Sequence, residues 1–159
     1  MLVDSSIVDE VDREILRLLQ EQGDLTAREL AEEVGLTPTP VWRRVQNLEK
    51  DGVIRGRVAL VDPAALNLDV TALVHIRTND HSAAWLDRFC AGIADLSEIV
   101  EAYRTSGEID YTLKVVVPSI EAYDDFYKRL IARVDLYDVR TVFVMEQMKQ
   151  TTALPLDYL

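Results

Sequence analysis

The chain has 159 residues with 28 acidic and 17 basic side chains, a formal net charge of −11, and a single cysteine. This length allows one moderate domain or two small ones. One cysteine excludes an intramolecular disulfide and a cysteine-based metal cluster, and we interpret Cys90 as a small apolar helix residue. The N-terminus MLVDSSIVDEVDRE lacks the features of a signal peptide, and no apolar run could cross a bilayer. We therefore expect a cytoplasmic protein without a membrane partner.

The charge is unevenly distributed along the chain. Residues 1–57 hold 12 acidic and 8 basic side chains, a net of −4, and residues 58–159 hold 16 and 9, a net of −7. Such acidity argues against general binding to nucleic acids, because an acidic surface repels phosphates. Within residues 41–57, however, five basic side chains face two acidic ones, a net of +3. One local DNA-binding surface remains compatible with this distribution.

The first 53 residues have the pattern of three short helices. Apolar side chains recur at helical spacing in residues 9–21. Thr26 and Glu29 form a capping-box pattern that begins a second helix. A third helix is expected over residues 38–51, with Thr37 as its N-cap. Three helices with a turn of about four residues before the last one describe a helix-turn-helix domain.

The third predicted helix has a rigid start and a polar outer face. Pro38 and Pro40 both fall in its first turn, where their missing N–H groups break no helical hydrogen bond. In such domains the N-terminal residues of this helix read bases in the DNA major groove. We predict a DNA-contact set consisting of Thr37, Thr39, Trp42, Arg43, Arg44, Gln46 and Asn47.

These side chains have different expected roles on DNA. Arg43 could donate a bidentate pair to guanine, and Gln46 could pair with adenine. Thr37 and Thr39 could meet phosphates at the helix start. Trp42 could pack against a neighbouring helix or lie on the sugar-phosphate edge. The alternative is a small helical bundle in which the arginines only keep one face hydrated.

The middle of the chain separates two domains. Residues 53–61, VIRGRVALV, suggest an extended segment that could be a small wing or a strand linker, and Asp62-Pro63 marks a turn. We expect a winged-type helix-turn-helix domain over residues 1–53, a linker over 54–64 and a second domain over 65–159.

The second domain has the element order β-α-β-β-α-β of a ferredoxin-like sandwich, which makes the whole chain an α+β protein. Both helices would cover one face of a four-stranded sheet. The other face, which alternates in valine, leucine and phenylalanine, is expected to pair with a second copy. The expected strands are 70–78, 98–105, 111–117 and 139–145, with helices over 82–95 and after Pro118-Ser119.

Across residues 8–155 the chain resembles the leucine-responsive regulatory protein and AsnC family of transcription regulators. The segments that carry the resemblance are VDREILRLLQEQGDLTARELAEEVGLTPTPVWRRVQNLEKDGVIRGRVALVDP, TSGEIDYTLKVVVPSIEAY and TVFVMEQMKQTTALPL. The resemblance implies double-stranded DNA as a partner and a homodimer that often assembles to an octamer. It also implies a small-molecule effector, commonly an amino acid, bound by a domain of the regulation of amino-acid metabolism type.

The loop SGEID matches the family segment that helps to line the effector cleft. From the residues alone, Asp110 could pair with an ammonium group, and free loop amides could hold a carboxylate. The alternative is a simple β-turn in which Gly107 permits the tight backbone. The effector set implied by the resemblance is Ser106, Gly107, Glu108 and Asp110, with Thr105 and Thr141 as neighbours.

Two other classes of function are alternatives to a ligand-responsive regulator. An enzyme is disfavoured, because the sequence has no motif for a nucleophile elbow, phosphate loop or dinucleotide site and no paired Cys/His spacing. We expect no cofactor and no metal, and we interpret His75 and His81 as structural. An architectural DNA-binding protein without a ligand is the remaining alternative.

Overall fold

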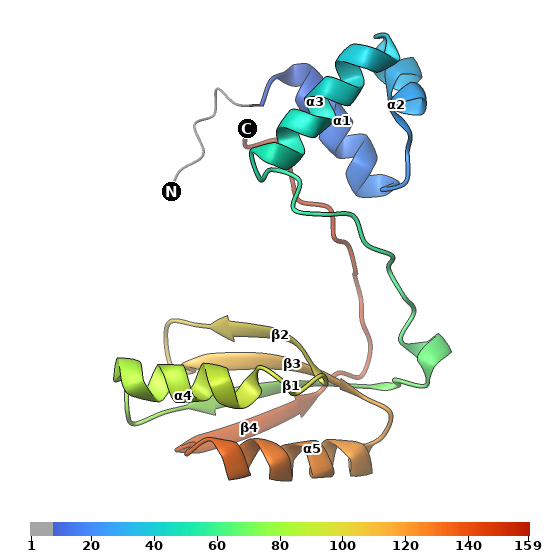
Figure 1. Cartoon of the computed structure of the whole chain (residues 1–159). Helices are drawn as coiled ribbons and strands as arrows, with labels where there is room; N and C mark the ends of the chain where they lie inside the picture. The colour runs from blue at the N-terminus through green and yellow to red at the C-terminus, as the bar shows by residue number, and fades with distance from the viewer. Residues whose placement is uncertain (1–7) are drawn as a thin grey trace. The chain divides into compact units, whose positions relative to one another are not determined.

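The computed structural model describes residues 8–159, so that residues 1–7 of the expected first domain lie outside the described part. The chain forms two compact units (Figure 1). The first, which we call the head, comprises the residues up to Leu60 together with Lys149–Leu159. The second, which we call the sheet domain, is Val61–Met148. No helix among the described residues is long and apolar enough to span a membrane.

Three helices build the head: α1 (Glu10–Glu21), α2 (Ala27–Val34) and α3 (Pro38–Lys50). The predicted capping box is confirmed at α2, where the Thr26 side chain accepts from the Glu29 amide and Glu29 accepts from the Thr26 amide. Asp9 forms the same kind of box with Asp12 at α1. Each box satisfies backbone donors that a helix start would otherwise leave unpaired.

The core of the head is made by the apolar faces of the three helices. Ile15 of α1, Leu30 of α2 and Val41 of α3 are at most 1% exposed. Burying such side chains contributes roughly 1.5–3 kcal/mol each relative to leaving them in water. The buried apolar cluster consists of Ile15, Leu16, Leu18, Leu30, Ala31, Val41, Val45 and Leu48.

The chain leaves α3 through Gly52, whose φ of +75° is a left-handed conformation that favours glycine. In the described chain, residues 53 and 54 form a bend and residues 55–61 form no helix or strand. Val58 and Leu60 are 83% and 73% exposed. Within one chain, this segment is therefore a linker and not a wing. A short 3-10 helix at Ala64–Leu66 follows before the sheet begins.

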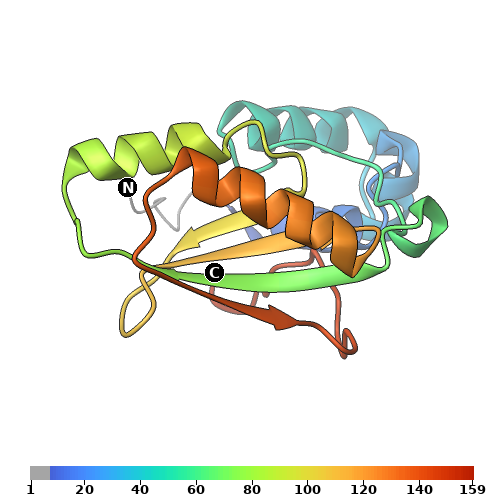
Figure 2. The ribbon, with the colours of Figure 1, turned by 90° about the horizontal axis from the view of Figure 1, so that it is seen from below.

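The sheet domain confirms the predicted βαββαβ order. All strand pairs are antiparallel, in the spatial order β2-β3-β1-β4. Figure 2 shows both helices on one face of this sheet. Its elements are β1 (Val70–Arg77), α4 (Ala83–Ile93), β2 (Ile99–Arg104), β3 (Tyr111–Val117), α5 (Ile120–Arg133) and β4 (Asp138–Phe143).

The core of the sheet domain lies between the helices and the covered sheet face. Trp85 and Phe89 of α4 stack with ring centroids 5.1 Å apart, and both contact Tyr111 of β3. The Trp85 indole also donates to the Asp135 carbonyl at 3.0 Å. This bond satisfies the one polar group that the buried indole carries.

The open face of the sheet is more polar than the sequence predicted. The strand register places Tyr103, Thr112, His75 and Arg140 in one row across it. Phe143, by contrast, pairs with Ala72 and packs against Tyr123 of α5, on the helix-covered side.

The prediction of phenylalanine on the open face was therefore wrong. Successive residues of a strand point to opposite faces, and the start of β4 sets which side receives Phe143. The partly buried apolar side chains that remain on the open face come from β1 and β3, with Leu73 beside Val142 of β4.

The structure also divides the chain differently from the expected boundary at residue 65. Lys149–Leu159 was expected to belong to the second domain but belongs to the head. Leu156 packs against the apolar cluster of the head, and Gln20 of α1 hydrogen-bonds the backbone of Leu154.

Candidate DNA-contact surface and effector loop

The start of α3 leaves polar groups free for a ligand. Thr37 is the N-cap residue, but its hydroxyl makes no capping hydrogen bond. Pro38 occupies the first helical turn as expected. The Thr37 hydroxyl is therefore available at the positive end of the helix dipole, where phosphates bind favourably.

The outer face of α3 carries most of the predicted DNA-contact set. Its inner face is buried through Val41, Val45 and Leu48. The helical period then directs the polar side chains outward. The exposed members of the predicted set are Thr37, Thr39, Trp42, Arg43, Gln46 and Asn47.

The two adjacent arginines of α3 have different surroundings. Arg43 is exposed and has no ion-pair partner among the described residues. Arg44 donates to Asp9 at 2.7 Å and to Asp12 at 2.8 Å. Its side chain therefore fastens α3 to the start of α1, and we leave it out of the DNA-contact set proposed below.

The Arg44 cluster is held by charge and by backbone donors. The carboxylates of Asp12 and Asp9 raise the pKa of Arg44 above its ordinary value. The pKa of Asp9 is lowered, first by the hydrogen bond from the Asp12 amide and then by Arg44. Asp12 is only 8% exposed, so this pair carries part of the packing between two helices.

Two neighbours modify the α3 surface. The Gln46 side chain donates to Glu49 at 3.1 Å, an exposed bond that a base could replace. Arg57 pairs with the same Glu49 at 3.0 Å. Trp42 is 54% exposed and borders a shallow groove with Leu25 of the α1–α2 turn. One part of the Trp42 indole thus contacts the head, and the other part is free to contact another molecule.

The β2–β3 loop, residues 105–110, is closed by its own hydrogen bonds. The Thr105 amide donates to the Asp110 carbonyl at 2.8 Å, and the Thr105 hydroxyl donates to the Ile109 carbonyl at 2.5 Å. Gly107 has a φ of +113°, which side chains rarely tolerate. These features define a fixed, glycine-dependent turn.

Asp110 anchors this loop to β1. Its carboxylate accepts from the Thr78 amide at 2.8 Å, and its own amide donates to the Ile76 carbonyl at 3.1 Å. The side chain is half-buried, and a carboxylate has further acceptor positions beyond one backbone bond. Thr78, which the sequence analysis did not select, therefore helps to place Asp110.

The tip of the loop offers donors and charge. Within the described residues, the amides of Ser106, Gly107 and Glu108 donate no hydrogen bond. Glu108 lies 3.8 Å from Arg140 of β4. Sequence reasoning missed Arg140, because only the strand register brings it beside the loop. Free amides and a nearby guanidinium are groups that can hold a carboxylate.

Thr141 lies apart from the loop. It faces the helix-covered side of β4, where its hydroxyl contacts the hydroxyl of Tyr123 on α5. The two hydroxyls satisfy each other in a partly buried position. We therefore leave Thr141 out of the effector site proposed below.

A single chain does not enclose the loop. Residues 105–108 are all exposed. Three grooves of the described chain lie on the head, and none of them includes these residues. The loop thus offers polar and charged groups that suit a small charged ligand. The described chain does not enclose that position in the way that ligand pockets usually do.

Comparison with known proteins finds one family model for each half of the chain. Residues 8–55 match the family model described as winged helix-turn-helix DNA-binding. Residues 71–154 match the model described as the Lrp/AsnC ligand binding domain. The two matched segments contain the α3 surface and the β2–β3 loop, respectively.

Full-length relatives support both matches. The chain is 44% identical to the DNA-binding transcriptional activator DecR of Escherichia coli K12, covering 95% of this chain and all of that one. It superposes with a TM-score of 0.92 on the crystal structure of an AsnC family regulator from Agrobacterium tumefaciens, at 55% identity and 96% and 99% coverage. A Neisseria meningitidis transcriptional regulator, solved as an L-Met complex, gives a TM-score of 0.90, 32% identity and 95% and 98% coverage.

Proposed function

The chain belongs to the Lrp/AsnC family of transcription regulators, and we propose that it binds double-stranded DNA through α3 and responds to an amino acid bound at the β2–β3 loop. The observation that carries this proposal is the outer face of α3, where Arg43 is exposed beside an arginine that is fixed within the head.

The DNA-binding part of the proposal rests on α3. Arg43 is the donor for a guanine edge, Gln46 and Asn47 are the neighbouring polar readers, and Thr37 and Thr39 meet phosphates. The acidic remainder of the chain disfavours binding to arbitrary DNA. Sufficient affinity then requires two heads acting together on a two-fold repeated site.

The effector part rests on the chemistry of the loop. The free amides of residues 106–108, with Arg140 beside them, suit the carboxylate of an amino acid. The remaining acceptor positions of Asp110 suit its ammonium group. The methionine complex of the Neisseria relative supports an amino acid as the ligand class.

We further propose that a homodimer is the functional unit and that dimers assemble to an octamer. The open sheet face offers Leu73, Val142 and a polar row that a second copy could cover. The exposed loop tip lacks walls in one chain, which a neighbouring subunit could supply. Light scattering of the purified protein measures the assembly directly.

DNA binding is tested with Arg43→Ala on duplexes that the wild-type protein selects from a random pool. We expect the variant to bind the selected duplex about 1–3 kcal/mol more weakly. Arg88→Ala, at an exposed position of α4, removes the same charge outside the head and serves as the control. Equal affinities of wild type and Arg43→Ala would remove Arg43 from the contact surface.

Effector binding is tested by thermal shift against the twenty amino acids. A bound ligand stabilises the folded protein in a concentration-dependent way. We expect one chemical group of amino acids to raise the Tm and Asp110→Ala to abolish the rise. A flat response across the panel would favour the second candidate, an architectural DNA-binding protein without a ligand. That function requires the α3 surface but no effector site.

A further inference from the structure

An apolar groove of about 670 Å³ runs along the head. One wall comes from Leu16 and Leu19 of α1, and another from Val53 and Ile54 after α3. A third wall comes from the C-terminal segment Lys149–Leu159, which we call the strap. Leu156 is half-buried there and packs against the apolar cluster of the head.

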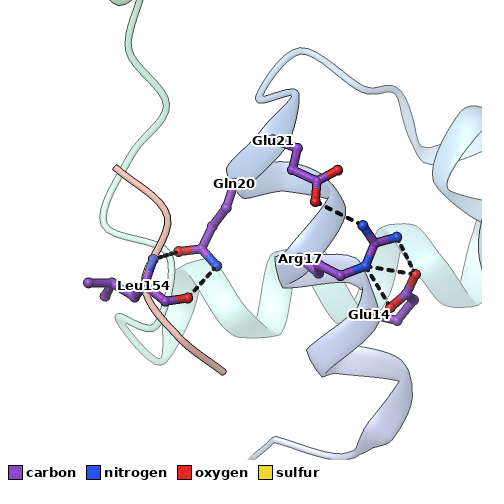
Figure 3. A network of polar contacts seen from close by, with 5 residues as sticks. All are labelled: Glu14, Arg17, Gln20, Glu21 and Leu154. Atoms are coloured by element: carbon purple, nitrogen blue, oxygen red, sulfur yellow. Dashed lines mark hydrogen bonds and ion pairs between the residues drawn. The ribbon is translucent and has the colours of Figure 1, made fainter. Parts of the chain in front are cut away.

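Polar contacts fix where the strap sits along α1. The Gln20 side chain accepts from the Leu154 amide at 2.6 Å and donates to the Leu154 carbonyl at 3.3 Å (Figure 3). A glutamine amide offers the same donor and acceptor as a peptide group, so the pair reproduces one step of strand pairing. Farther along α1, the Arg13 guanidinium donates to the Leu159 carbonyl at 2.7 Å.

The sequence of the strap suits an extended bound conformation. Pro155 fixes its own φ and biases Leu154 before it toward extended backbone. It also has no N–H group that docking would leave unpaired. Fewer conformations of the free segment reduce the entropy that is lost when the strap docks.

The strap leaves the DNA-contact surface free. Its partners lie on α1 and on the segment after α3. Arg43, Gln46 and Asn47 of α3 do not line its groove. Docking of the strap and binding of DNA are therefore compatible.

We propose that the strap is a second connection that restrains the DNA-binding head, so that DNA affinity depends on residues that touch no DNA. The chain leaves the head after Leu60, builds the sheet domain and returns from β4 to the head, where the strap packs against α1. A head held by two connections samples fewer orientations than a head on one flexible linker. The DNA consequence rests on the proposed function; the docking of the strap does not.

Hydrogen exchange of the full-length protein tests docking. We expect peptides from residues 149–159 to exchange at least about tenfold more slowly than unstructured chain. Gln20→Ala should accelerate exchange in this segment and in α1. Glu21→Ala is the matched control, because the adjacent Glu21 pairs with Arg17 and not with the strap (Figure 3). Exchange of the wild-type segment at the unstructured rate would overturn the proposal.

Cross-linking tests which chain supplies the strap. Gln20→Cys and Leu154→Cys are combined with Cys90→Ser, which removes the one native cysteine. A short bismaleimide should give an internally cross-linked monomer, in which a proteolytic fragment of α1 stays joined to the C-terminal peptide. A covalent dimer as the product would overturn the assignment of the strap to the head of its own chain.

The DNA consequence is tested on a duplex selected by the wild-type protein. Leu156→Ala should bind about tenfold more weakly, since loosening one of two connections removes only part of the gain from restraint. Tyr158→Ala is the control, because that side chain belongs to the strap but is 89% exposed and does not line the groove. Exchange of α3 at the assay temperature verifies that the variant head is folded.

The two proposals fail differently in this assay. If Arg43→Ala weakens binding but Leu156→Ala does not, the strap proposal is refuted and the DNA-contact surface stands. If Arg43→Ala leaves binding unchanged while hydrogen exchange still finds the strap docked, the DNA-contact surface is refuted and strap docking stands.

Discussion

Replacing Arg44 by alanine should destabilise the head without removing a DNA contact. Arg44 donates to Asp9 at 2.7 Å and to Asp12 at 2.8 Å, and its loss leaves the largely buried Asp12 without its cation. Breaking a fully buried pair costs roughly 3–5 kcal/mol, whereas exposed pairs contribute about 0–1 kcal/mol. The side chains of Asp12 and Asp9 are 11% and 53% exposed, so we expect a loss of about 2 kcal/mol, between these limits.

Hydrogen exchange followed by mass spectrometry measures this loss separately in each unit. A decrease of about 2 kcal/mol in the opening free energy corresponds to roughly thirtyfold faster exchange in peptides from α1. Peptides from β3 should not change, because they belong to the sheet domain. Arg43→Ala is the companion variant and should leave exchange in α1 unaltered. If both variants accelerated exchange equally, the division of roles between the two arginines would be wrong.

Three further perturbations test other parts of the structure. A Cβ added at Gly92 would lie 2.5 Å from a methyl group of Val134. Gly92→Ala should therefore lower the Tm, although alanine gains about 1 kcal/mol in helix propensity over glycine. Adding Val134→Ala removes the clashing methyl group, so the double variant should lose less than the sum of the two single variants. The Cβ added by Gly107→Ala would meet no atom within 4 Å, but alanine would have to adopt a φ of +113°, a strain of about 1–3 kcal/mol. This variant should therefore accelerate hydrogen exchange in residues 105–110 and leave exchange in the head unchanged. Because the folded head lowers the pKa of Asp9 below its ordinary value of 3.8, the charge of Asp9 stabilises the fold above that value, and this contribution is lost as the pH falls through the lower pKa of the folded state. Urea melts of wild type and Asp9→Asn should therefore differ at pH 7, and the difference should shrink as the pH is lowered below 3.8.

Local sequence signals predicted the helices of the head and the order of the sheet domain. Thr26 and Glu29 formed the expected capping box, because that signal involves residues only three apart. The polar face of α3 followed from its helical period. Each of these features depends on residues that lie close together in the sequence, so it could be predicted from the sequence alone.

Features that depend on distant residues were missed. The partners of Arg44 are 32 and 35 positions away, so the sequence did not identify them. The face of β4 that carries Phe143 and Thr141 depends on a register that alternation alone cannot set. The position of Arg140 beside the β2–β3 loop was not predicted for the same reason.

The strap also has a consequence for the synthesis of the protein. Gln20 and Leu154 are separated by 134 positions, so α1 emerges from the ribosome long before its partner exists. A chain grows from its N-terminus at roughly 5–20 residues per second, and early domains normally fold first. Here the contact between Gln20 of α1 and Leu154 can form only after the strap has been synthesised. A chain that terminates early, or that loses its C-terminus to a protease, would then carry all of α3 and still lack a fully restrained DNA-binding head.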